Sequence, residues 1–113
     1  AGESITLGIA NTLIGGLAGD AINQGNQNVA IGHAALSTNQ EGDSNVAIGF
    51  EALYTLNPAD GNSYNTAVGT QAGKLMTTGI RNTIIGGLAG DVLTTGSYKT
   101  KTTLAKRTRI MWL

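Results

Sequence analysis

A nine-residue pattern that occurs five times is the feature that most constrains the fold of this chain of 113 residues. The copies begin at Asn11, Asn28, Asn45, Asn65 and Asn82, with spacings of 17, 17, 20 and 17 residues. No copy contains a pair of residues that performs chemistry together. The pattern is therefore a structural period rather than a site.

The copies agree in chemical type at each position. The third residue after Asn is β-branched: Ile14, Ile31, Ile48, Val68 and Ile85. The next residue is glycine: Gly15, Gly32, Gly49, Gly69 and Gly86. Three residues later comes alanine: Ala18, Ala35, Ala52, Ala72 and Ala89. A second glycine precedes each following unit: Gly25, Gly42, Gly61, Gly79 and Gly96.

The spacing of glycine argues against helices, because an amphipathic helix needs about 10 to 12 uninterrupted residues. Four- or five-residue segments rich in Val, Ile and Thr, bounded by Gly, Asn and Asp, are typical of short strands and turns. Two strands and two turns account for one unit. The predicted fold is all-β: a parallel β-solenoid, or β-roll, of about five rungs of 17 residues. Successive rungs would stack about 4.8 Å apart.

Each repeated position then has an expected role. The Asn column would tolerate left-handed backbone at a turn and form a side-chain amide ladder. The Ile and Val column would fill the interior. The Gly column would permit a tight corner or a close backbone approach. The longer third unit would carry its extra residues in a loop around Pro58 and Gly61 that protrudes from the column.

The narrow unit also predicts association between chains. Two short strands enclose little apolar volume, whereas ordering each residue costs about 1 to 2 kcal/mol. A second apolar set remains beside the strands: Leu17, Leu36, Leu53, Leu75, Leu88 and Leu93. We therefore expect several chains to share a core, most simply as a homotrimer.

The two ends differ from the repeats. Residues 1–10 are predicted to form an N-terminal half-rung or cap, in which Ser4 to Gly8 ("SITLG") mimics the first half of a unit and covers an open sheet edge. Residues 11–98 form the solenoid, and Lys99 occupies a sixth Asn position. Residues 99–113 are a basic terminating cap, a docking tail for a neighbouring protein, or the start of another module. Its expected docking residues are Lys106, Arg107, Arg109 and Trp112.

Charge is divided along the chain although the formal net charge is zero. Residues 1–98 contain seven acids and two bases, and the last fifteen residues contain five bases and no acid. Such asymmetry can mark a tail that binds nucleic acid or a membrane. Five charges with one aromatic residue, Trp112, are a weak signal, and no apolar run approaches the about 18 residues of a membrane helix. Neither nucleic-acid binding nor membrane insertion is expected.

Apparent chemical sites are better explained as structure. "GGLAGD" at 15–20 and 86–91 lacks the period of calcium-binding repeats, and His33 occupies a variable outward position. The carboxylates of Glu41, Asp43 and Glu51 lie in turns at unlike offsets. A triad of Ser37, His33 and Asp43 has no strained nucleophile elbow to support it. With no cysteine and no phosphate-binding loop, no enzymatic activity, cofactor or metal is predicted.

The units resemble repeats of known fibre proteins. "NVAIGFEAL" and "NTAVGTQAG", with "TTG" at 77–79 and "TTGS" at 94–97, resemble repeats in tail fibres of tailed bacteriophages. They are also similar to the Asn-x-x-Ile-Gly repeats in the head domains of bacterial trimeric autotransporter adhesins. The likeness covers about residues 9–98 and implies a trimeric, left-handed parallel β-roll. The 17-residue period is longer than the autotransporter unit, which favours the phage fibre.

Three functions follow as expectations. The first is a structural fibre or spike segment of a phage virion, with itself, neighbouring virion proteins and a host-surface receptor as partners. The second is an adhesin repeat domain on a bacterial cell surface. The third is an ice-binding solenoid, disfavoured because Val29 and Val46 interrupt the Thr column. Receptor contacts are expected in the turn 37–43 and the inserted loop 55–64, at Asn39, Glu41, Asp43, Asn57, Asp60, Asn62 and Tyr64.

Overall fold

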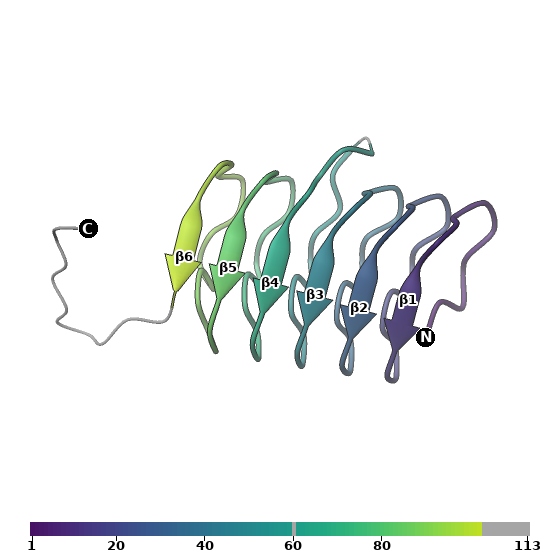
Figure 1. The fold of residues 1–113 in the computed structure, drawn as a ribbon, viewed down its shortest axis with the longest axis horizontal. Coiled ribbons are helices and arrows are strands. Elements are labelled where there is room, and N and C mark those ends of the chain that lie inside the picture. Colours follow the sequence, from purple (N-terminus) through teal and green to yellow (C-terminus); the bar gives the residue numbers. More distant parts are fainter. Residues whose placement is uncertain (60, 103–113) are drawn as a thin grey trace, which may run out of the picture.

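One parallel sheet runs the length of the molecule. The computed structural model describes residues 1–59 and 61–102. Its six strands are β1 (Thr12–Ile14), β2 (Val29–Ile31), β3 (Val46–Ile48), β4 (Thr66–Val68), β5 (Thr83–Ile85) and β6 (Thr100–Thr102). They pair in chain order, and Figure 1 shows them side by side along the long axis. The described residues contain no helix, which confirms the predicted all-β parallel solenoid of about five rungs.

Each rung has one strand rather than the predicted two. The remaining residues form a return segment, made of turns, that leads to the next strand. Return segments contain left-handed residues, such as Leu36 with φ of 54° and Leu53 with φ of 50°, and a strand cannot include that conformation. Backbone hydrogen bonds still join the return segments of neighbouring rungs. The Leu36 N–H, for example, donates to the Ala52 carbonyl at 2.9 Å. The second side is therefore a stack of turns.

The interior is lined by the middle residue of strands β1 to β5, not by the third. Ala30, Ala47, Ala67 and Ile84 are fully buried and face the alanine column of the return segments. Neighbouring residues of a strand point to opposite faces, so the first and third residues point outward. The predicted interior column of Ile14, Ile31, Ile48, Val68 and Ile85 is thus wrong. Ile14 is 57% exposed and Ile85 is 42% exposed.

The core is narrow, and side-chain sizes compensate across it. Where the strand supplies Ala30, the return segment supplies the buried Leu36. Where the strand supplies Leu13, the facing residue is Gly19, and a Cβ at Gly19 would lie 2.6 Å from Leu13 Cδ2. The six leucines that the sequence analysis placed beside the strands are therefore partly inside and partly outside the core. Leu36 and Leu53 are buried, Leu93 packs against the core, and Leu17, Leu75 and Leu88 are exposed.

The N-terminal residues continue the 17-residue register as the second half of a unit. The Gly2 N–H donates to the Ala18 carbonyl at 2.9 Å, and the Gly8 N–H donates to the Asn23 carbonyl at 3.0 Å. The expected first-half register is wrong, because these partners belong to a return segment and β1 is left unpaired on one side within the described residues.

The solenoid continues past residue 98 at the other end. The Lys99 N–H donates to Asn82 Oδ1 at 2.9 Å, so Lys99 does occupy the sixth Asn position. β6 then pairs with β5 in the same register as the earlier strands. The proposed docking residues Lys106, Arg107, Arg109 and Trp112 lie outside the described residues, as does Asp60.

Candidate interaction surfaces

The Asn column forms a buried amide ladder. Asn28, Asn45, Asn65 and Asn82 are at most 1% exposed. Each Oδ1 accepts the backbone N–H of the next residue in the column at 2.9 to 3.1 Å. Most of the Nδ2 groups donate to the carbonyl of a glycine 14 residues later at 2.8 to 2.9 Å, whereas Asn45 donates to Ser63 Oγ. The left-handed backbone expected at Asn lies one residue earlier, as at Gln27.

The glycine column allows the rungs to touch at the corner after each strand. Gly32 has φ of +125°, and a Cβ built on it would lie 2.8 Å from the carbonyl group of Gly49. Gly15, Gly49 and Gly69 have equivalent geometry, and Gly86 shares the positive φ, at 122°. Both columns therefore serve the architecture and are not available to a ligand.

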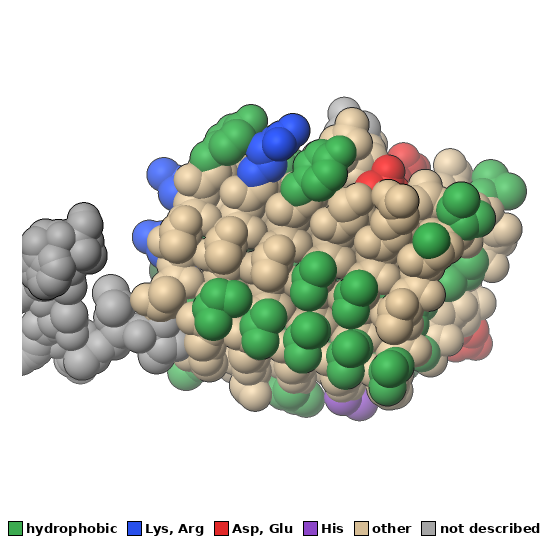
Figure 2. All heavy atoms as spheres, in the orientation of Figure 1, with side chains coloured by type: hydrophobic (Ala, Val, Ile, Leu, Met, Phe, Trp, Pro, Cys, Tyr) green, Lys and Arg blue, Asp and Glu red, His purple; other side chains and the backbone are tan. Residues whose placement is uncertain are grey.

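The outer sheet face is formed by the outward residues of β1 to β5 in two rows. The first row contains Thr12, Val29, Val46, Thr66 and Thr83, and the second contains Ile14, Ile31, Ile48, Val68 and Ile85. Neither row includes a charged side chain. Figure 2 shows the hydrophobic side chains as a regular row across this face. The exposed Leu17, Phe50 and Leu88 lie on the corner that follows the second row. This surface is regular, uncharged and largely apolar.

The ionisable residues weighed as chemical sites are dispersed. His33 is exposed, as predicted, and stacks on Phe50 with ring centroids 5.8 Å apart. Glu51 pairs with Lys74 Nζ at 2.8 Å. Asp43 Oδ1 accepts the Asn26 N–H at 2.6 Å. No group of three potential metal ligands occurs among the described residues.

The predicted receptor-contact residues have mixed locations. Asn39 is fully buried and donates from Nδ2 to the Gly42 carbonyl at 2.9 Å, so its assignment to a contact surface is wrong. It occupies the interior column that holds Ile22 in the first rung, so its side chain points inward. Glu41, Asn62 and Tyr64 are exposed, and Asp43 and Asn57 are half-buried. The loop between β3 and β4 extends beyond its neighbours, as Figure 1 shows.

One cluster was not predicted. The guanidinium carbon of Arg81 lies 4.9 Å from the ring centroid of Tyr64 and 5.9 Å from that of Tyr98. Each of the three residues directly precedes the Asn position of its rung and has positive φ. Aligning the residue before each Asn would have shown that they share one column.

No family model, curated protein or solved structure matches the chain. The described part of the chain has no helix able to cross a membrane and no pocket. The exposed surfaces are therefore the features from which a function can be argued.

Proposed function

We propose that the chain is a structural segment of a homotrimeric fibre or spike of a phage virion. The outer sheet face is the observation that supports this proposal most directly. A large, regular and uncharged apolar surface on a soluble domain is typical of a surface that another protein covers. The phage context and the left-handed winding come from the resemblance of the repeats.

Burial of the second row supplies the driving force for association. Burying an exposed Ile or Val side chain contributes about 1.5 to 3 kcal/mol. Ile14 and Ile85 retain 57% and 42% exposure, so several kcal/mol of apolar stabilisation are not realised within one chain. In a threefold assembly each chain contributes two different surfaces. The sheet face and the corner with Leu17, Phe50 and Leu88 are two such surfaces.

The proposed role is mechanical support together with presentation of loops. Every rung is covalently joined to the next and hydrogen-bonded to it along the strand and the return segment. Such a column holds exposed residues at a fixed axial spacing of about 4.8 Å. Glu41, Asn62 and Tyr64 are then the members of the predicted contact set that an external receptor can reach.

Sedimentation equilibrium tests the assembly. The chain has a mass of 11.5 kDa, so a trimer has three times that mass, 34.5 kDa. Ile48→Asp would place a charge in the middle of the second row, and we expect it to dissociate the trimer. Thr78→Asp, on the exposed return side, is the matched control and should leave the mass unchanged. A wild-type chain that stays monomeric, folded and cooperative at all concentrations would rule out the proposed fibre.

A further inference from the structure

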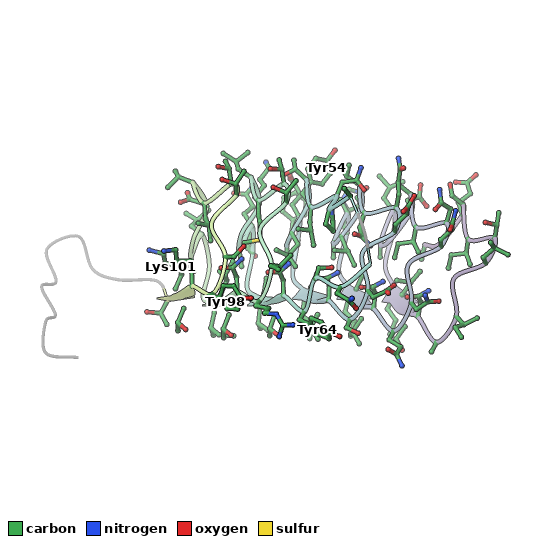
Figure 3. All side chains as sticks on the ribbon, turned by 90° about the horizontal axis from the view of Figure 1, so that it is seen from above. Tyr54, Tyr64, Tyr98 and Lys101 are labelled. Atoms are coloured by element: carbon green, nitrogen blue, oxygen red, sulfur yellow. The ribbon has the colours of Figure 1, made fainter. Side chains whose placement is uncertain are left out.

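Tyr64, Arg81 and Tyr98 form an exposed column, here named the Tyr–Arg–Tyr ladder. Tyr64 is 45% exposed and Tyr98 is 72% exposed, and Arg81 lies between them. Figure 3 shows both tyrosines on the strand side of the column, away from Tyr54 on the return side. The ladder begins where the inserted loop 55–64 ends, next to the predicted receptor contacts.

The backbone presents the three side chains in one orientation. Their φ values are 52°, 58° and 59°, so all three share the left-handed conformation. Each N–H donates to a carbonyl of the preceding rung, with distances of 3.3, 2.7 and 3.0 Å for Tyr64, Arg81 and Tyr98. The ladder is therefore built on fixed backbone, and a ligand would not have to order a loop before binding.

Arg81 keeps its hydrogen-bond donors available. The guanidinium carbon lies over the rings of Tyr64 and Tyr98, and no hydrogen-bond acceptor in the described part of the chain pairs with the guanidinium N–H donors. Among the described residues no carboxylate pairs with Arg81, in contrast to Lys74, which pairs with Glu51. An arginine whose fork of donors is unpaired and whose guanidinium lies against two aromatic rings is suited to a carboxylate or a similar planar anion.

Charge along the column favours an anion at this end. Residues 1–60 contain six acids and no Lys or Arg, whereas residues 61–102 contain four bases (Lys74, Arg81, Lys99 and Lys101) and only Asp91 as an acid. Lys99 and Lys101 are exposed. A local excess of positive charge raises the concentration of anionic ligands nearby.

The spacing of the ladder selects an extended ligand with sparse charge. Tyr64 and Tyr98 are two rungs apart, which is roughly 10 Å along the axis. This length contains a single arginine, flanked by flat aromatic rings and phenol hydroxyls. A chain of sugars with a carboxylate on alternate units has this arrangement of charge and apolar surface. A nucleic acid has a phosphate on every unit, and the acid-rich rungs beyond Tyr64 would repel it.

We propose that the Tyr–Arg–Tyr ladder binds an acidic polysaccharide, with a sugar carboxylate on the Arg81 guanidinium and the adjoining sugars against Tyr64 and Tyr98. This inference rests on the proposed attachment role and supplies the chemical class of the receptor. It also moves the principal contact from the loops to a regular part of the column.

Calorimetric titration with a hyaluronan octasaccharide at physiological ionic strength tests the proposal, with its carboxyl methyl ester as the matched neutral ligand. Arg81→Gln should weaken binding about tenfold or more, because a hydrogen bond to a charged group is lost. Tyr64→Ala and Tyr98→Ala should each weaken binding about twofold to fivefold. Lys74→Gln removes the same charge elsewhere, and Gln27→Ala alters the same column in another rung; both should bind normally.

The proposal is overturned if the octasaccharide shows no saturable binding or if its methyl ester binds equally well. It is also overturned if Lys74→Gln and Arg81→Gln lose equal affinity, or if a single-stranded oligonucleotide binds more tightly than the octasaccharide. Arg81→Lys keeps the charge without the fork and should be intermediate. Circular dichroism and sedimentation of the same samples verify the fold and the mass. If the chain is a monomer and binds the octasaccharide, the binding proposal stands and the trimer is refuted. If the chain is a trimer and does not bind the octasaccharide, the trimer stands and the binding proposal is refuted.

Discussion

Removing one buried member of the amide ladder should destabilise the column strongly. Asn45 is fully buried, its Nδ2 donates to Asn28 Oδ1 at 3.1 Å and to Ser63 Oγ at 2.9 Å, and its Oδ1 accepts the Asn65 N–H at 3.1 Å. Asn45→Ala loses both donated bonds, at a net cost of about 0.5 to 1.5 kcal/mol each. It also leaves the buried Asn65 N–H without an acceptor, which costs about 1 to 3 kcal/mol.

The expected total is about 2 to 6 kcal/mol, a large fraction of the about 5 to 15 kcal/mol that stabilises a typical domain. For a domain of this size the melting temperature should fall by roughly 10 to 20 °C. Thermal unfolding followed by circular dichroism measures the change. Protein concentration must be the same throughout, because association would raise the melting temperature with concentration.

Asn62→Ala is the matched control. Asn62 is exposed, and within the described residues its side chain takes part in one long contact, of 3.4 Å from the Tyr64 hydroxyl. The control should change the free energy of unfolding by less than about 0.5 kcal/mol. If Asn45→Ala melts no lower than Asn62→Ala, the ladder does not stabilise the fold and the reasoning from buried donors and acceptors is refuted.

Two further substitutions test the corner and the core. Gly32→Ala should destabilise by about 2 kcal/mol or more, because its φ of +125° is strained for alanine and the new Cβ would meet Gly49 at 2.8 Å. Gly16→Ala should be nearly neutral in urea unfolding, because its Cβ would contact only His33 at 3.4 Å. Leu53→Ala should cost about 2 to 5 kcal/mol, since Leu53 is fully buried. Leu75→Ala, at a site 46% exposed, should cost less than about 1 kcal/mol, and equal losses at the two leucines would contradict the assigned interior.

The period and the parallel pairing could be predicted from the sequence, whereas the side of the strand that faces inward could not. In β2 and β3 all three residues are apolar, so alternation of polar and apolar residues gives no direction. We expected the third residue, a bulky Ile, to fill the interior, but in β2 and β3 the smaller Ala30 and Ala47 take the inward position beside the buried Leu36 and Leu53. The available signal was covariation: Leu13 faces Gly19, whereas Ala30 accompanies Leu36.

Register also explains the errors at the candidate contact surface. Asn39 is polar and lies in a turn, which suggested exposure, but it belongs to the interior column of Ile22 and Met76. The insertion before Asn65 hides this alignment in the third unit. The Tyr–Arg–Tyr ladder was missed for a different reason. Its column contains Ala10, Gln27 and Ser44 in the first rungs, so nothing in the consensus of the repeat marks it.

The narrow interior and the apolar exterior have one physical origin. A rung with one three-residue strand has room inside for Ala opposite Leu, or for Leu or Ile opposite Gly. In the fourth rung Ala67 accompanies Gly73, and the side chains of Leu53 and Ile84 from the adjoining rungs lie against Gly73. Parallel pairing still favours β-branched residues at the outward positions, because they pack well against the same residue on the next strand. The outer rows therefore gather apolar area that one chain cannot cover. This area grows in proportion to the number of rungs, as does the hydrophobic stabilisation gained by covering it. In the proposed fibre, lateral association would strengthen with each added repeat, because every rung carries the same outward apolar surface.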